Sequence, residues 1–372
     1  MDFNAEQNQK LGELITRLIA KNDLTREEAF SAFQMILKDE VTDMQQGAFL
    51  AALTAKGETA DEVAAGWQAI YDLDTRKVTL DDLEPADNCG TGMDSFKTFN
   101  ISTAAALVGA AGGINIARHG ARAITSARGT VDMAESLGVD MECDVDTVAR
   151  SIKECGIGLF NGMSPKVHPM ALGRILSQIR FGSPLNIAAS LANPALPRIA
   201  VRGVYSPDLL RPVAEVMHSI GYSDAIVIYG AIAGSDKGMD EASVCGTSKA
   251  IHLRNSDLTE LSFNPQEFGL QLHKPAAIAA DTDHHNAALN MIRLLAGQGD
   301  TARSDAVILN SALLFYVKKT VTSIDEGVKK AETILLSGKP LKQLEKWVEI
   351  QNENPETGLR KLADLKTKAG VN

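Results

Sequence analysis

Short β-prone runs alternate with helical stretches and glycine turns after Thr79, and this alternation most constrains how the chain folds. Strands are predicted at residues 114–117, 157–160, 199–201 and 225–229. Helices are predicted at residues 131–137, 145–155, 207–220 and 285–296. Because helical crossovers return the chain to the same end of a sheet, the pattern predicts an α/β domain with a mostly parallel central sheet.

The first 75 residues show helical periodicity only and predict a small helical bundle. Thr25 with Glu28, Thr42 with Gln45, and Thr59 with Glu62 each have the spacing of a capping box. Residues 169–192 are also helical in pattern and are expected to return to this bundle. A chain of 372 residues is long enough for two domains. We predict a helical domain of residues 1–78 with 169–192, and an α/β domain of residues 79–168 and 193–372.

The composition is typical of a soluble enzyme. A formal net charge of −10 repels phosphodiester backbones, so nucleic acid is not expected as a partner. The longest small-apolar stretch, from Thr103 to Ile114, is too short to span a bilayer, so no membrane is expected. The four cysteines lack C-x-x-C spacing and the first residues lack a secretory signal pattern, which predicts a cytoplasmic protein.

An anion-binding loop is predicted at residues 87–94, Asp-Asn-Cys-Gly-Thr-Gly-Met-Asp. Glycines on both sides of Thr91 let the backbone turn sharply and direct its N–H groups at an anion. Asn100, Ser102 and Thr103 follow at the start of a small-residue helix, whose N-terminal N–H groups favour phosphate. A glycine turn alone is usually only a turn, so this prediction depends on its neighbours.

Basic residues gather after the strand predicted at residues 114–117. Arg118-His119-Gly120-Ala121-Arg122 comes first, and Ser126-Ala127-Arg128-Gly129-Thr130-Val131-Asp132 then opens a helix. Open α/β sheets bind ligands at the carboxyl ends of their strands, and guanidinium groups match phosphate oxygens. The alternative is that Arg122 and Arg128 are surface charges. Next to a glycine loop, a phosphate site is the favoured interpretation.

The order of the motifs resembles one known family, the anthranilate phosphoribosyltransferases of glycosyltransferase family 3. The resemblance covers nearly the whole chain and rests on Gly90-Thr91-Gly92-x-Asp94, Thr98-x-Asn100-x-Ser102-Thr103, His119-Gly120, Gly129-x-x-Asp132, His168-Pro169, Asn193-Pro194, Val201-Arg202-Gly203-Val204 and Gly238-x-Asp240-Glu241. It implies a helical domain, an α/β domain like that of the nucleoside phosphorylases, and an active site between the two. It also implies a homodimer joined through the helical domain.

The resemblance further implies a site for 5-phosphoribosyl 1-pyrophosphate (PRPP) and Mg²⁺. The implied metal ligands are Ser102, Asp240 and Glu241, since Mg²⁺ prefers hard carboxylate oxygens and substrate phosphates. Arg118 stands where the family usually has Lys, which keeps the charge and changes the donor geometry. The implied donor-binding residues are Gly90, Thr91, Gly92, Asp94, Thr98, Asn100, Ser102, Thr103, Arg118, Gly120, Ser126 and Gly129.

On the acceptor side the sequence departs from the family pattern. Met93 and Ala121 replace a glycine and an asparagine, and Ala189-Ser190-Leu191 replaces Gly-Pro-Leu. The family arginine that pairs with the anthranilate carboxylate aligns with residues 176–178. Because a buried carboxylate without its cation is costly, we hypothesise that anthranilate is not the natural acceptor. The implied acceptor-binding residues are Ala121, His168, Arg174, Gln178 and Arg180.

The implied reaction passes the phosphoribosyl group to a small aromatic or heteroaromatic acceptor and releases pyrophosphate, through an oxocarbenium-like transition state by analogy with glycosyl transfer. No general base is assigned. His119 is the candidate catalytic residue, as a group that orients the acceptor, or else a hydrogen-bonded loop histidine. Two alternatives stay open: a nucleoside phosphorylase-like enzyme, against which the Asp240-Glu241 pair argues, and a non-catalytic relative that binds a metabolite or nucleic acid.

Overall fold

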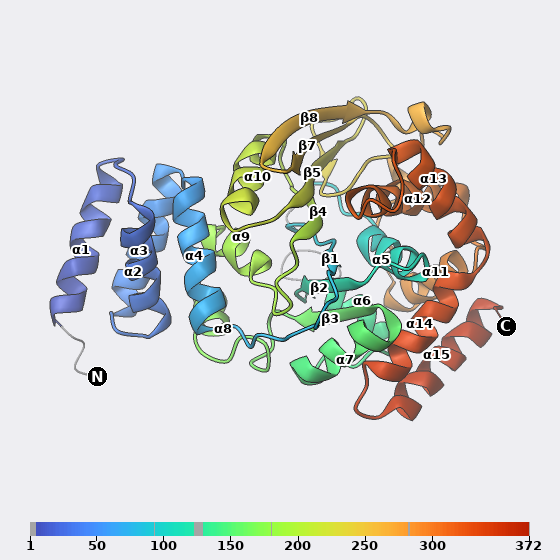
Figure 1. Cartoon of the computed structure of the whole chain (residues 1–372), viewed down its shortest axis with the longest axis horizontal. Helices are drawn as coiled ribbons and strands as arrows, with labels where there is room; N and C mark the ends of the chain where they lie inside the picture. Colours follow the sequence, from blue (N-terminus) through green and yellow to red (C-terminus); the bar gives the residue numbers. More distant parts are fainter. Residues whose placement is uncertain (1–4, 93, 123–128, 180, 282, 372) are drawn as a thin grey trace.

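The computed structural model describes residues 5–92, 94–122, 129–179, 181–281 and 283–371. At its centre is a mixed sheet of strand order β3-β2-β1-β4-β5-β7-β8, with β6 paired to β5 (Figure 1). The parallel strands are β1 (Ala86–Asp87), β2 (Ile116–Gly120), β3 (Ile157–Asn161), β4 (Ile199–Gly203) and β5 (Asp224–Ala231). The antiparallel strands are β6 (Gly238–Met239), β7 (Ser248–Arg254) and β8 (Asp257–Phe263). The predicted mostly parallel sheet is confirmed.

Helices cover both faces of this sheet. On one face, Ile199 and Val201 of β4 belong to the core formed with α5 (Ile101–Ala111), α12 (Thr301–Val317), α13 (Ile324–Leu336) and α14 (Lys339–Ile350). On the other face, Ala200 packs with α9 (Pro184–Leu191) and α10 (Leu210–Ser219). Alternate residues of one strand thus enter two different cores. The remaining elements are α6 (Thr130–Ser136), α7 (Val145–Cys155), α8 (Leu172–Gln178), α11 (His284–Leu295), α15 (Pro355–Ala369) and the short 3₁₀ helices η1 (Pro207–Leu209), η2 (Pro265–Phe268) and η3 (Pro275–Ala277).

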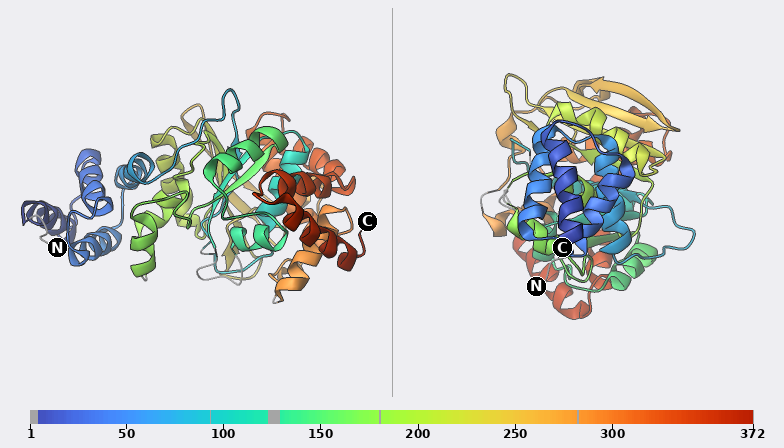
Figure 2. Two further views of the ribbon diagram at one scale, coloured as in Figure 1. Left: turned by 90° about the horizontal axis from the view of Figure 1, so that it is seen from below. Right: turned by 90° about the vertical axis from the view of Figure 1, so that its left-hand side faces the viewer.

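The N-terminal bundle consists of α1 (Ala5–Ile19), α2 (Arg26–Leu37), α3 (Asp43–Lys56) and α4 (Ala60–Leu73), and it stands at the end of the molecule opposite the C-terminus (Figure 2). Thr25 and Thr59 form complete capping boxes, whereas at Thr42 only the hydroxyl accepts a backbone bond. Trp67 of α4 donates to the Leu191 carbonyl oxygen at 2.9 Å, which ties the bundle to α9. The predicted domain boundaries remain a prediction. No helix of the described residues is long and apolar enough to cross a membrane.

Strand β2 differs from its prediction in a way that matters for the site. It starts at Ile116, two residues late, and runs to Gly120, so Arg118 and His119 lie inside the strand rather than after it. Both side chains are buried. Because neighbouring strand residues point to opposite faces, Arg118 reaches α5 and His119 reaches α9. Strand β5 likewise extends beyond its predicted range of residues 225–229, from Asp224 to Ala231.

Candidate active site

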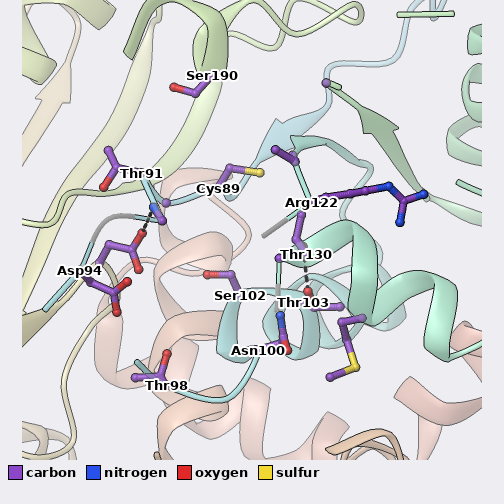
Figure 3. Close-up of a pocket in the computed structure, with 18 of the residues that line it drawn as sticks. Cys89, Thr91, Asp94, Thr98, Asn100, Ser102, Thr103, Arg122, Thr130 and Ser190 are labelled. Carbon is purple, nitrogen blue, oxygen red and sulfur yellow. Dashed lines mark hydrogen bonds between the residues drawn. The ribbon is translucent and has the colours of Figure 1, made fainter. Parts of the chain in front are cut away.

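A cavity of about 740 Å³ lies at the carboxyl ends of the parallel strands. Its walls come from the glycine loop after β1, the start of α5, the end of β2, and the segment of α8 and α9. Asp94, Thr98 and Ser102 lie on one side of it, and Ser190 of α9 lies apart from them (Figure 3). Every implied donor-binding residue that the structure describes, and the acidic pair Asp240 and Glu241, line this cavity.

The glycine loop and the acidic pair are in direct contact. The Gly92 N–H donates to Asp240 Oδ2 at 2.7 Å, and a Cβ on Gly90 would lie only 2.0 Å from the same oxygen. Glu241 accepts from the Thr98 and Ser102 hydroxyls at 3.2 and 3.3 Å. The structure therefore brings together six of the residues singled out from the sequence, although some 140 residues separate the acidic pair from the loop and the start of α5.

The carboxylates of this cluster repel one another in a buried place. Burial, followed by the charge of Asp240, raises the pKa of Asp94 to about 6. Burial and the charges of Asp240 and Asp94 raise the pKa of Glu241 well above its usual value. Lys97 offsets part of this charge, with its Nζ 3.0 Å from Asp94 Oδ1. Such a cluster fits a hard divalent cation, because a cation relieves the mutual repulsion of the carboxylates, which adds to the effect of burial on both pKa values.

The described residues hold no group of three His, Cys, Asp or Glu side chains arranged as a complete metal site. Mg²⁺ is commonly held by one or two carboxylates together with substrate phosphates, so the two carboxylates of Asp240 and Glu241 are enough to contribute to a magnesium site. The predicted ligands Ser102, Asp240 and Glu241 remain a prediction.

Arg118 lies beneath the N-terminus of α5. Its Nη1 donates to the Thr103 hydroxyl at 2.8 Å, and its Nη2 donates to the Asn88 carbonyl oxygen at 3.3 Å. The Asn88 amide in turn donates to the Ser102 carbonyl oxygen at 2.7 Å. Arg118 thus braces the hydroxyl-bearing first turn of α5 and adds positive charge where that helix end already favours an anion.

Of the three guanidinium groups predicted to gather here, only those of Arg118 and Arg122 belong to the described residues, and Arg122 is engaged elsewhere. Arg122 points away from the cavity centre (Figure 3) and is paired with Glu135 at 2.6 Å, Glu142 at 2.9 Å and Asp132 at 3.4 Å. Its charge is satisfied within the protein, so the surface-charge alternative describes Arg122 better than a phosphate site. Arg128, like Ser126, Met93 and Arg180, lies outside the described residues.

The side of the cavity formed by α8, α9 and the segment between them is largely apolar. Leu172, Leu176, Ile179, Phe181 and Ala189 line it, together with Ala121. Gln178 does not line the cavity. Arg174 does not line it either, because its guanidinium is held by the N-terminal bundle, 3.1 Å from Asp39, 3.3 Å from Asp43 and 3.2 Å from Gln46.

Two buried histidines meet near α9. His119 lines the cavity, and its Nε2 lies 3.1 Å from Nε2 of His168, which stands behind it. Burial, followed by His168 and Arg202, lowers the pKa of His119 to about 3, and burial also lowers the pKa of His168. His119 is therefore a neutral strand residue at the cavity wall rather than a loop histidine.

Two residues of this region were not singled out from the sequence. Arg202 was noted only as part of a motif, yet its buried guanidinium donates to the Ser190 hydroxyl, and its Nε and Nη1 have no partner among the described residues. Asp74 ends α4 and accepts from the backbone N–H groups that begin α8. The position of Arg202 within an otherwise apolar strand could have marked it as a candidate site residue. The sequence around Asp74 contains no comparable pattern.

The neutral state of His119 predicts how stability depends on pH. Its pKa falls from 6.5 in the unfolded chain to about 3 in the folded one, so the stability it contributes is complete above pH 6.5. That stability is lost as the pH falls below 6.5, by up to about 1.4 kcal/mol per pH unit. We expect His119→Gln to remove this slope in urea unfolding measured at pH 7, 6 and 5. If the free energy of unfolding changed with pH by the same amount in the wild type and the variant, the neutral state assigned to His119 would be contradicted.

Comparison with known proteins agrees with the fold. Residues 12–73 match the helical bundle domain of the glycosyl transferase family, and residues 83–341 match its a/b domain. The chain is 34% identical to the anthranilate phosphoribosyltransferase of Methanothermobacter thermautotrophicus, over 91% of this chain and 97% of that protein. It is 34% identical to the anthranilate phosphoribosyltransferase of Exiguobacterium sibiricum, over 90% and 96%.

Solved structures show the same architecture. The anthranilate phosphoribosyltransferase of Thermus thermophilus superposes with a TM-score of 0.81 at 30% identity, covering 91% of this chain and 98% of that one. The Saccharomyces cerevisiae enzyme in complex with PRPP and Mg has a TM-score of 0.79 at 23% identity, covering 96% and 98%. The fold and the two family matches together define a glycosyl transferase with a helical bundle and an a/b domain. Within that class, the chain belongs to the anthranilate phosphoribosyltransferase family.

Proposed function

We propose that this protein transfers the phosphoribosyl group of PRPP to a small aromatic or heteroaromatic amine, with Mg²⁺, and that anthranilate is not its natural acceptor. The observation that carries the proposal is the contact between the glycine loop and the acidic pair, in which Gly92 donates to Asp240 and Ser102 donates to Glu241. Relatives named as anthranilate phosphoribosyltransferases, one of them solved with PRPP and Mg, support PRPP as the donor of the phosphoribosyl group.

The chain's own residues have separate tasks in this reaction. Mg²⁺ held by Asp240 and Glu241 with the pyrophosphate would neutralise charge on the leaving group. The N–H groups of the first turn of α5 would fix the phosphates beside the glycine loop, and Arg118 braces that turn. The acceptor stands on the opposite side, beside His119 and the apolar side chains of α8 and α9.

The residues that line the cavity support the part of the proposal that concerns the acceptor. Leu172, Leu176 and Ile179 favour an apolar ring. Arg174, the nearest described arginine to the family's carboxylate-binding position, is bound to Asp39 and Asp43 instead. A carboxylate on the acceptor would lose its hydration without gaining this cation. We also propose a homodimer, as the family resemblance implies.

Pyrophosphate release with a panel of acceptors tests this function. We expect turnover with an aromatic amine that lacks a carboxylate, and at least tenfold lower kcat/KM with anthranilate. Arg174→Ala should leave both values unchanged, because the side chain is engaged elsewhere; Arg180→Ala examines the other flanking arginine. Anthranilate as the best substrate, with kcat/KM reduced in either variant, would refute the acceptor assignment. Metal-independent cleavage of nucleosides by free phosphate would favour the phosphorylase alternative.

A further inference from the structure

The last helix, α15, lies outside both regions that match the family. Those regions are residues 12–73 and 83–341, whereas α15 begins only at Pro355. The helix packs beside α14 and α11 at the C-terminal end of the molecule (Figure 1). Its inner face belongs to the main core, where Leu362 and Leu365 are buried. α15 is therefore an integral part of this fold that the two family matches do not include.

Gln351, which follows α14, covers the outer edge of the central sheet. β3 is the outermost strand on this side, and the Gln351 side chain bonds to both backbone groups of Leu159 in that strand. Its Oε1 accepts from the Leu159 N–H at 3.0 Å, and its Nε2 donates to the Leu159 carbonyl oxygen at 3.0 Å. Leu159 is paired in register with Arg118 of β2, which lines the cavity. Because buried backbone groups require partners, Gln351 fixes the C-terminal segment to this edge.

The residues after Gln351 hold the end of α6 that lies away from the cavity. Nδ2 of Asn352 donates to the Gly138 carbonyl oxygen at 3.0 Å, and Nζ of Lys361 donates to the Glu135 carbonyl oxygen at 2.6 Å. Carbonyl groups at the end of a helix need such partners from outside the helix. Gly358 of α15 packs directly on Gly138, and a Cβ on Gly358 would lie 2.4 Å from the Gly138 carbonyl oxygen. The two backbones approach this closely because Gly358 has no side chain.

The other end of α6 forms part of the cavity wall. Gly129 and Thr130 line the cavity, and the Thr130 hydroxyl lies 3.0 Å from the hydroxyl of Thr103, which Arg118 holds in turn. α6 has only seven residues, too few to be stable without tertiary contacts, so the contacts at its two ends set its position. A helix of this length is a rod of about 10 Å, and a displacement at one end is passed on to the other.

The end of α15 is joined to a second wall of the cavity through α11. The Ala369 carbonyl oxygen accepts from Nε of Arg293 at 3.1 Å. Nη1 of Arg293 donates to Asn290 Oδ1 at 3.1 Å, and Nδ2 of Asn290 donates to Asp281 Oδ1 at 3.1 Å. Asn290 and Asp281 both line the cavity. Contacts made by α15 thus reach the cavity wall along two separate routes, through α6 and through α11.

We propose that residues 351–371 form a C-terminal brace that holds α6 and α11 in place and thereby sets the affinity of the cavity for PRPP. Gln351, Asn352 and Gly358 are positioning residues of this brace, because they contact β3 and α6 and do not line the cavity themselves. The inference rests on the proposed function, in which Gly129 belongs to the donor site. It adds to that site a part of the chain that lies outside the matched regions.

Gly358→Ala tests the brace with the smallest added volume. The new Cβ has to move α15 about 1 Å away from Gly138 to reach an ordinary contact distance. A misplacement of about this size far from the reacting atoms can cost up to about a hundredfold in activity, and we expect the dissociation constant of PRPP with Mg²⁺ to rise about tenfold. Thr357→Ala, at an exposed position of the same helix, is the matched control and should bind as the wild type does.

Asn352→Ala tests the same contact without added volume. It removes the hydrogen bond to Gly138 and introduces no clash, so folding does not depend on accommodating a new atom. Loss of one hydrogen bond is expected to weaken PRPP binding about threefold in calorimetric titration of the full-length protein. Wild-type affinity for PRPP in both Gly358→Ala and Asn352→Ala would overturn the inference.

Hydrogen–deuterium exchange of the ligand-free protein separates positioning from a general loss of stability. We expect faster exchange in α6 in Gly358→Ala and Asn352→Ala, with exchange in the distant helix α3 as in the wild type. Unchanged exchange in α6, or an equal increase in α3 and α6, would overturn the inference. Failure of the wild type to bind PRPP would reject the proposed function, whereas the exchange measurement examines the brace without any ligand.

Discussion

Replacing Asp240 with Asn is expected to remove magnesium-dependent binding of PRPP and to slow pyrophosphate release by about 10²–10³-fold, the usual loss when one preorganised electrostatic group is deleted. The substitution keeps the shape of the side chain and removes the charge. Asp240 Oδ2 accepts from the Gly92 N–H, so the carboxylate proposed to hold Mg²⁺ also shapes the glycine loop. Rate and affinity are therefore both expected to fall.

Asp236→Asn is the matched control. It makes the same change of charge four residues earlier, at an exposed position, and should leave the rate and the magnesium dependence as in the wild type. Initial rates of pyrophosphate release at several Mg²⁺ concentrations distinguish the two variants. Equal rates in Asp240→Asn and Asp236→Asn would show that the acidic pair has no part in the reaction.

Gly203→Ala is expected to destabilise the protein by roughly 3–5 kcal/mol, in the range of the largest single substitutions. A Cβ at this position would lie 1.6 Å from the Asp240 carbonyl oxygen and 2.5 Å from its carbon, so the end of β4 or the acidic segment must move. Gly203 also accepts from the Thr91 N–H at 3.2 Å, which means that the shift would spread into the glycine loop. Stability and PRPP binding are expected to fall together.

The control for this substitution is Gly47→Ala. Gly47 lies within α3, and a Cβ there meets nothing within 4 Å. Ala in a helix interior is favoured over Gly by roughly 0.5–1 kcal/mol, so this variant should match or exceed the wild type in thermal unfolding. Wild-type stability and PRPP binding in Gly203→Ala would mean that β4 does not approach Asp240 as described.

Much of the fold could be predicted because local signals agreed with tertiary packing. Helix α7, at Val145–Cys155, was predicted to the residue, since a strong amphipathic pattern ends at Gly156 in the left-handed conformation. The hairpin of β7 and β8 was missed. Its two turn residues, Asn255 and Ser256, both have positive φ without the glycine that usually marks such a turn.

The candidate site was predictable where motifs are local and unpredictable where partners are distant. The glycine loop and the residues that begin α5 lie in one stretch of sequence and meet at the cavity as expected. The ion pairs of Arg122 with Glu135 and Glu142 could not be predicted, because they depend on how α6 and the segment after it pack in the folded protein. The contact between His119 and His168 likewise joins residues 49 positions apart, and no periodic pattern encodes it.

Calorimetric titration of the wild-type protein with PRPP, with and without Mg²⁺, tests the central claim most directly. We predict binding that requires Mg²⁺, because the buried carboxylates Asp94, Asp240 and Glu241 repel pyrophosphate until a cation stands between them. Absence of binding under either condition would contradict a donor site for PRPP, and equal binding with and without Mg²⁺ would contradict the role given to the acidic pair.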